Sequence, residues 1–205
     1  MGNTKEDILN VSLHLFAKDG YKAVSVSQIA GALGMTKGAL YRHYQNKRDI
    51  FLSIVKRMEQ GDTKQAEDYN MPEGEEAKMP EKYDAISLRD FAGYSKSMFL
   101  YWTEDDFASS FRKMLTLEQF RSEEMQQLYQ QYLVSGPSEY VKDLFEHMGI
   151  LHAKELAAQF YAVMFFFYSM YDGAKEKDEV KRQFETTLDE FTKKLLIGGK
   201  KDEKL

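Results

Sequence analysis

Apolar residues recur at intervals of three and four along most of the chain, which is the period of an α-helix with one buried face. Only three prolines, Pro72, Pro80 and Pro137, interrupt this pattern. With 43% hydrophobic residues among 205, the chain can bury a sizeable core. We therefore predict an all-α fold.

Residues 4–19 form the first predicted helix, and Gly20 follows at the position where glycine commonly ends a helix. Ser25 and Gln28 have the spacing of a capping box, in which each side chain binds the other residue's backbone N–H group. The pattern predicts that a second helix starts at Ser25 and ends near residues 33–34.

Two further helix starts follow closely. Thr36 can cap a third helix, and Asn46 can cap a fourth that carries apolar residues from Ile50 onwards. After Gly61 the sequence becomes rich in Glu, Lys, Pro and Gly, which predicts a loop or a ragged helix end there. Later helical patterns resume near residue 87 and after residue 103, then cover residues 122–133. Gly136 and Pro137 are expected to break the pattern, a further helix carries apolar residues from Tyr140 to Gly149, and the last two cover residues 152–171 and 178–196.

Composition excludes several kinds of site and segment. The chain contains no cysteine, so it has no disulfide, thiolate metal site or cysteine nucleophile. The first residues are polar, and no segment offers the roughly 18 consecutive apolar residues of a membrane-spanning helix. We expect a cytoplasmic protein that has no membrane partner.

Charge is distributed unevenly along the chain. Residues 1–50 contain seven Lys or Arg and four Asp or Glu, a net charge of +3, whereas the whole chain has a net charge of −5. A nucleic acid responds to the local field rather than to the net charge of the whole protein. The basic N-terminal end is therefore the candidate contact surface.

The second and third predicted helices meet the steric requirements of a helix-turn-helix. Ala30 is small enough for two helices to cross, and Gly34 stands at the turn. The inner faces carry apolar residues, which are Ile29, Leu33, Met35 and Leu40. The alternative is an ordinary helical hairpin within a bundle.

The stretch "VSVSQIAGALGMTKGALYRHYQNKRDIF" resembles the DNA-binding signature of the TetR family of transcriptional regulators. The match covers roughly residues 4–55, about a quarter of the chain. The resemblance implies a helix-turn-helix three-helix DNA-binding domain over residues 1–50, joined to a larger helical ligand-binding and dimerisation domain over residues 51–205. It also implies a dimeric repressor in which the last two helices pair with their copies.

Hydroxyl groups and long cations near the predicted third helix suit contacts with phosphates and base edges. The resemblance carries DNA contacts over to Thr36, Lys37, Gly38, Tyr41, His43, Tyr44 and Lys47. We add Arg42 from its position and the serines of the preceding helix start, Ser25 and Ser27, from their hydroxyls. As alternatives, Tyr41 and Tyr44 pack against the first helix, and His43 lies on the surface without contacting DNA. Arg48 and Asp49 are expected to be solvated charges.

The larger predicted domain holds most of the aromatic residues, most of which are expected in its core. Its excess of Tyr and Met suits a cavity that is both apolar and hydrogen-bonding. The predicted ligand-binding residues are Trp102, Phe111, Met114, Glu118, Tyr129, Tyr161 and Phe165. Residues 152–171 are apolar around most of the helix circumference, which predicts burial on several faces or against another subunit.

No catalytic or metal-binding motif is present, and we predict neither an enzyme nor a cofactor. The predicted function is sequence-specific DNA binding to a palindromic operator, with release by a partly apolar or aromatic small molecule. One alternative is a DNA-binding regulator or architectural factor controlled by a protein partner. Another is a helical enzyme or carrier that has a vestigial helix-turn-helix.

Overall fold

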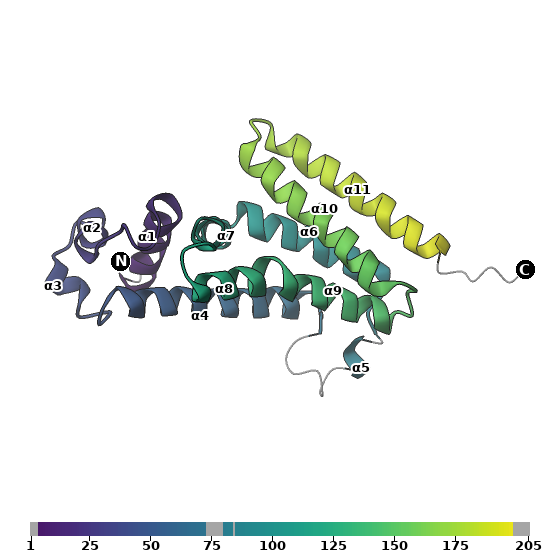
Figure 1. Ribbon diagram of the computed structural model, residues 1–205, viewed down its shortest axis with the longest axis horizontal. Coiled ribbons are helices and arrows are strands. Elements are labelled where there is room, and N and C mark those ends of the chain that lie inside the picture. Colours follow the sequence, from purple (N-terminus) through teal and green to yellow (C-terminus); the bar gives the residue numbers. More distant parts are fainter. Residues whose placement is uncertain (1–3, 73–79, 84, 199–205) are drawn as a thin grey trace, which may run out of the picture. The chain divides into compact units, whose positions relative to one another are not determined.

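The computed structural model describes residues 4–72, 80–83 and 85–198 (Figure 1). Regular structure in these ranges consists of helices and includes no strand, which confirms the predicted all-α fold. None of the helices described is both long and apolar enough to cross a bilayer. In chain order they are α1 (Thr4–Asp19), α2 (Val26–Ala32), α3 (Lys37–Leu40), α4 (Lys47–Asp68), α5 (Pro80–Tyr83), α6 (Leu88–Glu104), α7 (Asp106–Glu118), α8 (Glu123–Leu133), α9 (Ser135–His147), α10 (Ala153–Gly173) and α11 (Lys177–Gly198).

The helices divide into two units, and the first contains more than the N-terminal segment. It is made of residues 1–62 and 104–129, so α7 and the start of α8 belong with α1 to α3. Helix α7 packs directly against α1. The predicted boundary between residues 50 and 51 stays a prediction.

The predicted helix starts at Ser25, Thr36 and Asn46 and the predicted helix end at Gly20 are confirmed. The Ser25 side chain accepts from the backbone N–H of Gln28, and the Gln28 side chain accepts from the backbone N–H of Ser25. Thr36 and Asn46 accept in the same way at the starts of α3 and α4. Gly20 adopts φ +88°, a left-handed conformation that ends α1 and that side chains other than glycine rarely adopt.

Helix α4 is longer than predicted. It continues past Gly61 to Asp68, because a single glycine costs only about 1 kcal/mol relative to alanine and good helix formers follow it. Ala66, which is 7% exposed, gives this last part an apolar contact. The predicted loop therefore begins about two turns later. Residues 73–79 of that loop lie outside the described residues, and the short helix α5 was not predicted.

A core of fully buried side chains holds the first unit together. It includes the α1, α2 and α4 residues Ile8, Leu13, Phe16, Ile29, Ile50, Phe51 and Ile54, together with Leu40 of α3 and Phe111 and Leu115 of α7. The guanidinium of Arg57 in α4 lies 3.8 Å from the ring centre of Phe107 in α7. The N-terminal helices thus share their core with a segment that is distant in sequence.

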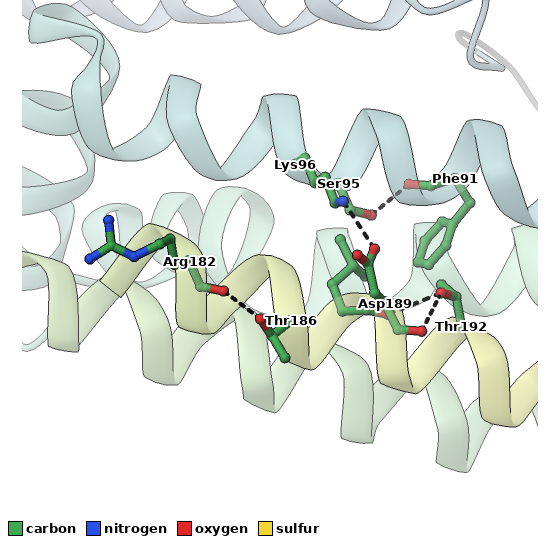
Figure 2. Close-up of polar contacts among 8 residues, drawn as sticks. Phe91, Ser95, Lys96, Arg182, Thr186, Asp189 and Thr192 are labelled. Atoms are coloured by element: carbon green, nitrogen blue, oxygen red, sulfur yellow. Dashed lines mark hydrogen bonds and ion pairs between the residues drawn. The ribbon is translucent and has the colours of Figure 1, made fainter. Parts of the chain in front are cut away.

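The second unit comprises residues 63–103 and 130–205, and its core is largely aromatic. Phe99 of α6 stacks on Phe184 of α11 with ring centres 4.2 Å apart. Helix α10 packs against both α9 and α11. Figure 2 shows a polar contact at the edge of this core, where Lys96 of α6 reaches Asp189 of α11 at 2.9 Å.

Helix α10 has two kinds of surface. Seven of its residues are buried within the unit, which agrees with the predicted burial on several faces. Two large aromatic residues do not share this burial, since Phe165 is 38% exposed and Phe166 is 58% exposed. Leu196, near the end of α11, is 59% exposed. The last two helices therefore present apolar side chains that the described part of the chain leaves exposed.

Candidate nucleic-acid interface

The turn between α2 and α3 has helix-turn-helix geometry. Gly34 adopts φ +64°, and the next residue, Met35, donates its backbone N–H to the carbonyl of Ala30 at 2.9 Å. Ala30 is 2% exposed, which agrees with its predicted place where the two helices cross. Leu40 is fully buried and anchors α3 on the core. The opposite side of α3 therefore faces outward.

Helix α3 exposes basic, aromatic and glycine residues together. Lys37, Tyr41 and Arg42 are all exposed, and the Lys37 ammonium lies 5.7 Å from the ring centre of Tyr41. At Gly38, an added Cβ would meet no protein atom within 4 Å. Glycine is therefore not required there by packing within the chain. It leaves the backbone of α3 accessible to a molecule that approaches from outside.

Tyr44 is placed differently from Tyr41. It is 6% exposed, and its hydroxyl donates to the backbone carbonyl of Lys5 in α1 at 3.3 Å. Burial raises the pKa of this hydroxyl above the ordinary value for tyrosine. Packing against the first helix, the alternative left open for Tyr44, is the arrangement in the structure. His43 is half-buried, and DNA contacts by either residue stay predictions.

The ammonium group of Lys47 is already occupied inside the first unit. It donates to the carbonyl oxygens of Tyr21 at 2.7 Å, Val24 at 2.8 Å and Lys22 at 3.4 Å. A lysine ammonium has three N–H donors, so these carbonyls use its whole capacity. A contact between Lys47 and a phosphate, which stays a prediction, would have to replace one of them.

The remaining predicted DNA contacts lie at helix starts. The hydroxyls of Ser25 and Thr36 cap α2 and α3, and both residues are exposed. Ser27 is exposed within α2. The structure thus brings Thr36, Lys37 and Gly38 together with Tyr41 and Arg42 at α3.

Arg48 and Asp49 have partners that the sequence did not reveal. Both terminal nitrogens of Arg48 donate to the carboxylate of Glu124 in α8, and a carboxylate oxygen of Asp49 accepts from the backbone N–H of Gln45. Arg48 is nevertheless 48% exposed and Asp49 is half-buried at the start of α4, so both remain partly solvated charges that also have protein partners. The Arg48 pair joins positions 76 residues apart, which no local pattern indicates.

The predicted ligand-binding residues fall into both units. Phe111, Met114 and Glu118 share helix α7 of the first unit, and each is at most 1% exposed. Tyr129 is in the same unit, and it is buried. The second unit contains the other three, of which Trp102 is buried, Tyr161 donates to the carbonyl of Leu133 at 2.8 Å, and Phe165 is partly exposed. Their ligand-binding role stays a prediction.

The N-terminal region is similar to a known family of proteins. Residues 8–54 match the model of the bacterial regulatory proteins of the tetR family. Over this region the chain is similar to the DNA-binding segment of tetR-family regulators. The matched segment includes α2, α3 and the residues around Gly38 described above.

Two curated relatives illustrate the match. The HTH-type transcriptional regulator AcrR of Shigella flexneri is 43% identical over 51 residues, which are 25% of this chain and 24% of the relative. The HTH-type transcriptional regulator QacR of Staphylococcus aureus is 40% identical over 53 residues, 26% of this chain and 28% of the relative. The chain thus matches about a quarter of the length of these relatives, which are transcriptional regulators.

Solved TetR-like structures resemble the chain over nearly its whole length. The complex of SmeT with triclosan covers 94% of this chain and 91% of its own, with a TM-score of 0.67 and 17% identity. The fatty acid degradation regulator FadR from Bacillus halodurans covers 97% of both chains, with a TM-score of 0.60 and 16% identity. At these identities the likeness establishes the fold, which combines an N-terminal helix-turn-helix with a larger helical region.

Proposed function

We propose that this protein is a homodimeric, sequence-specific DNA-binding transcriptional regulator, and that it acts as a repressor released from its operator by a small molecule. The observation that carries the proposal is the exposed side of α3. Lys37 projects from α3, and Tyr41 and Arg42 are exposed in the turn that follows it, while Leu40 anchors the opposite side of the helix. A short helix presented in this way fits the recognition helix of a helix-turn-helix.

Charge on this surface supports DNA as the partner. Lys37 and Arg42 are exposed cations, and cations that neutralise phosphates make binding strongly dependent on salt. Tyr41 offers a hydroxyl that can donate to a phosphate, and the bare backbone at Gly38 permits close approach. A palindromic operator matches two copies of this helix related by a two-fold axis.

Exposed aromatic residues on α10 support a homodimer. A chain that leaves Phe165 and Phe166 uncovered, with Leu196 on the neighbouring α11, can bury them against a second copy. Replacing Phe166 by Glu should convert the dimer to a monomer in sedimentation equilibrium at micromolar concentration. Phe120→Glu is the matched control, because Phe120 is 90% exposed and lies between α7 and α8.

The proposed effector is a small, partly apolar or aromatic molecule. The support is the set of buried aromatic side chains in α6 and α7 and the likeness to SmeT, whose structure contains triclosan. Triclosan is therefore the first probe. Trp102 is the single tryptophan, so a change in its fluorescence on titration would report binding. Since DNA is the partner, we also propose that the protein works in the cytoplasm.

DNA binding can be tested with duplexes that the wild-type protein selects from a random pool. The double variant Lys37→Ala with Arg42→Ala should bind the selected duplex at least tenfold more weakly. The slope of log K against log salt concentration should decrease by up to about two, which corresponds to the loss of two phosphate contacts. Lys193→Ala removes an exposed lysine from α11 and should bind like wild type. Failure of the wild-type protein to select any duplex would contradict the proposal and favour a carrier or enzyme.

A further inference from the structure

The turn that leads from α1 into α2 is held by two opposite charges. This α1–α2 turn is residues 20–24. On one side the Lys47 ammonium binds the carbonyl oxygens of Tyr21, Lys22 and Val24. On the other side the carboxylate of Glu118, the last residue of α7, accepts the backbone N–H of Tyr21 at 3.0 Å. The peptide units of the turn thus lie between an ammonium and a carboxylate.

Glu118 is buried at this position, and burial of a carboxylate is costly unless it is paired or hydrogen-bonded. It is 1% exposed, and the guanidinium of Arg121 lies 3.4 Å from the oxygen that accepts from Tyr21. A buried carboxylate at the end of an otherwise apolar helix face is a feature that packing alone does not require. Its protein partners are the Tyr21 N–H and Arg121.

Gly20 makes the contact sterically possible. A Cβ at this position would lie 2.8 Å from the Glu118 oxygen and 2.9 Å from an Arg121 nitrogen. The Tyr21 ring is also enclosed, because its centre lies 5.1 Å from those of both Phe16 and Phe51. The Lys47 ammonium lies 4.4 Å from the same ring centre. The α1–α2 turn therefore has one well-defined position relative to α4 and α7.

This position sets the placement of the DNA-reading helices. The turn runs into Ser25, the N-cap of α2, and α2 supports α3. Lys47 is the first residue of α4, the next helix after α3. The segment from α2 to α3 is therefore fixed where it begins, at the turn, and where it ends, at Lys47. A shift of Glu118 would move the beginning of this segment.

We propose that Glu118 and Lys47 are positioning residues for DNA recognition, which hold the helix-turn-helix in its binding position by clamping the α1–α2 turn. Glu118 acts through the N–H of Tyr21 and not by contacting the effector. Lys47 acts through three carbonyl groups and not by contacting a phosphate. The inference rests on the proposed DNA-binding function and extends it to how α7 is connected to the recognition helix.

The two possible effects of replacing Glu118 on DNA affinity have opposite signs. Removing a negative charge from a DNA-binding unit should by itself strengthen attraction to DNA. If Glu118 positions the turn, Glu118→Leu should instead weaken binding to the selected duplex at least tenfold, and the Tyr21 amide should exchange with solvent at least tenfold faster by NMR. Glu118→Gln keeps an oxygen acceptor of the same shape and should retain wild-type exchange and affinity within about threefold. This rescue separates the hydrogen bond from the charge.

The salt dependence of binding tests Lys47. Lys47→Met should lower affinity while leaving the slope of log K against log salt unchanged, because a clamp makes no phosphate contact. A slope reduced by about one would show that Lys47 binds a phosphate and would overturn its proposed role. If thermal unfolding shows that Glu118→Leu does not fold, this measurement still decides the part of the proposal that concerns Lys47.

The outcomes separate the inference from the function on which it rests. A wild-type protein that selects no duplex overturns both the proposed function and a positioning role in it. A wild-type protein that binds its duplex, with Glu118→Leu binding equally tightly, overturns only the clamp. Fast Tyr21 exchange in Glu118→Leu with unchanged affinity would likewise show that the turn does not position α3.

Discussion

Arg48 and Glu124 join the first turn of α4 to the first turn of α8 through two charge-assisted hydrogen bonds. The two side chains are 48% and 40% exposed, so solvent screens the pair. The pair is a link between two helices of the first unit rather than a major source of its stability. A double-mutant cycle with Arg48→Ala and Glu124→Ala should give a coupling energy below about 1 kcal/mol.

The same pair predicts a pH dependence. Hydrogen bonds from Arg48 hold the pKa of the Glu124 carboxyl below its ordinary value, because they favour the charged form. The coupling is therefore fully present above the ordinary glutamate pKa of about 4.3 and is lost as the pH falls through the lower folded-state value. Urea unfolding of the four cycle members at pH 7 and pH 3 checks this, and a coupling that grows at pH 3 would contradict it.

Asp62 shows the opposite behaviour. One of its carboxylate oxygens is buried and has no hydrogen-bond partner among the residues that the structure describes. Burial, aided by the charge of Glu59, raises the pKa of Asp62 to about 7. The folded protein binds this proton more tightly than the unfolded chain, so Asp62 lowers stability progressively as the pH rises from about 4 to above 7. Asp62→Asn should stabilise the protein by about 1–3 kcal/mol at pH 8 and by much less at pH 5. Chemical unfolding at both pH values measures this difference, and equal effects would contradict it.

Gly38 allows stability and DNA binding to be separated. An alanine methyl there would meet no protein atom within 4 Å, and alanine favours a helix over glycine by up to about 1 kcal/mol. Gly38→Ala should therefore raise the unfolding temperature while it weakens binding to the selected duplex several-fold, because the methyl would lie on the proposed DNA-binding surface. Gly93→Ala in α6 also has open space and is the matched control. It should leave DNA affinity unchanged.

Removing the capping box of α2 should lower the stability of the protein. Ser25→Ala removes the acceptor for the Gln28 N–H and should destabilise the protein by about 1 kcal/mol. Ser27→Ala, at an exposed position inside the same helix, should change stability by less than about 0.5 kcal/mol. Thermal unfolding of both variants compares them. Equal losses would mean that the box contributes nothing beyond an ordinary surface hydroxyl.

Local features of the first unit could be predicted from the sequence because their partners are only a few residues apart. The Ser25–Gln28 box, the Thr36 and Asn46 caps and the glycine at position 20 all follow from chemistry within one helical turn. The exposed side of α3 follows in the same way, since the buried position of Leu40 determines which residues face outward, and its contact with DNA stays a proposal.

Features that depend on distant partners could not be predicted. Glu118 accepts the backbone N–H of a residue 97 positions earlier, a contact that the sequence did not indicate, and its predicted ligand-binding role stays a prediction. Lys47 looked available to an anion because it begins a helix, but its ammonium is occupied by carbonyls 23 to 26 residues earlier. Such partners become visible only in the packing of α1 and α7, because the spacing of apolar residues in the sequence does not indicate which backbone groups a long side chain will reach.

The packing of α7 on α1 also affects how the protein folds during synthesis. The apolar face of α1, with Ile8, Leu13 and Phe16, emerges from the ribosome roughly a hundred residues before Phe111 and Leu115. Until then the N-terminal helices lack the part of their core that α7 supplies, and a nascent chain that ends after α4 contains the whole segment that matches the family model without the complete folded unit. The motif is therefore translated first, and its structure is completed only when α7 follows.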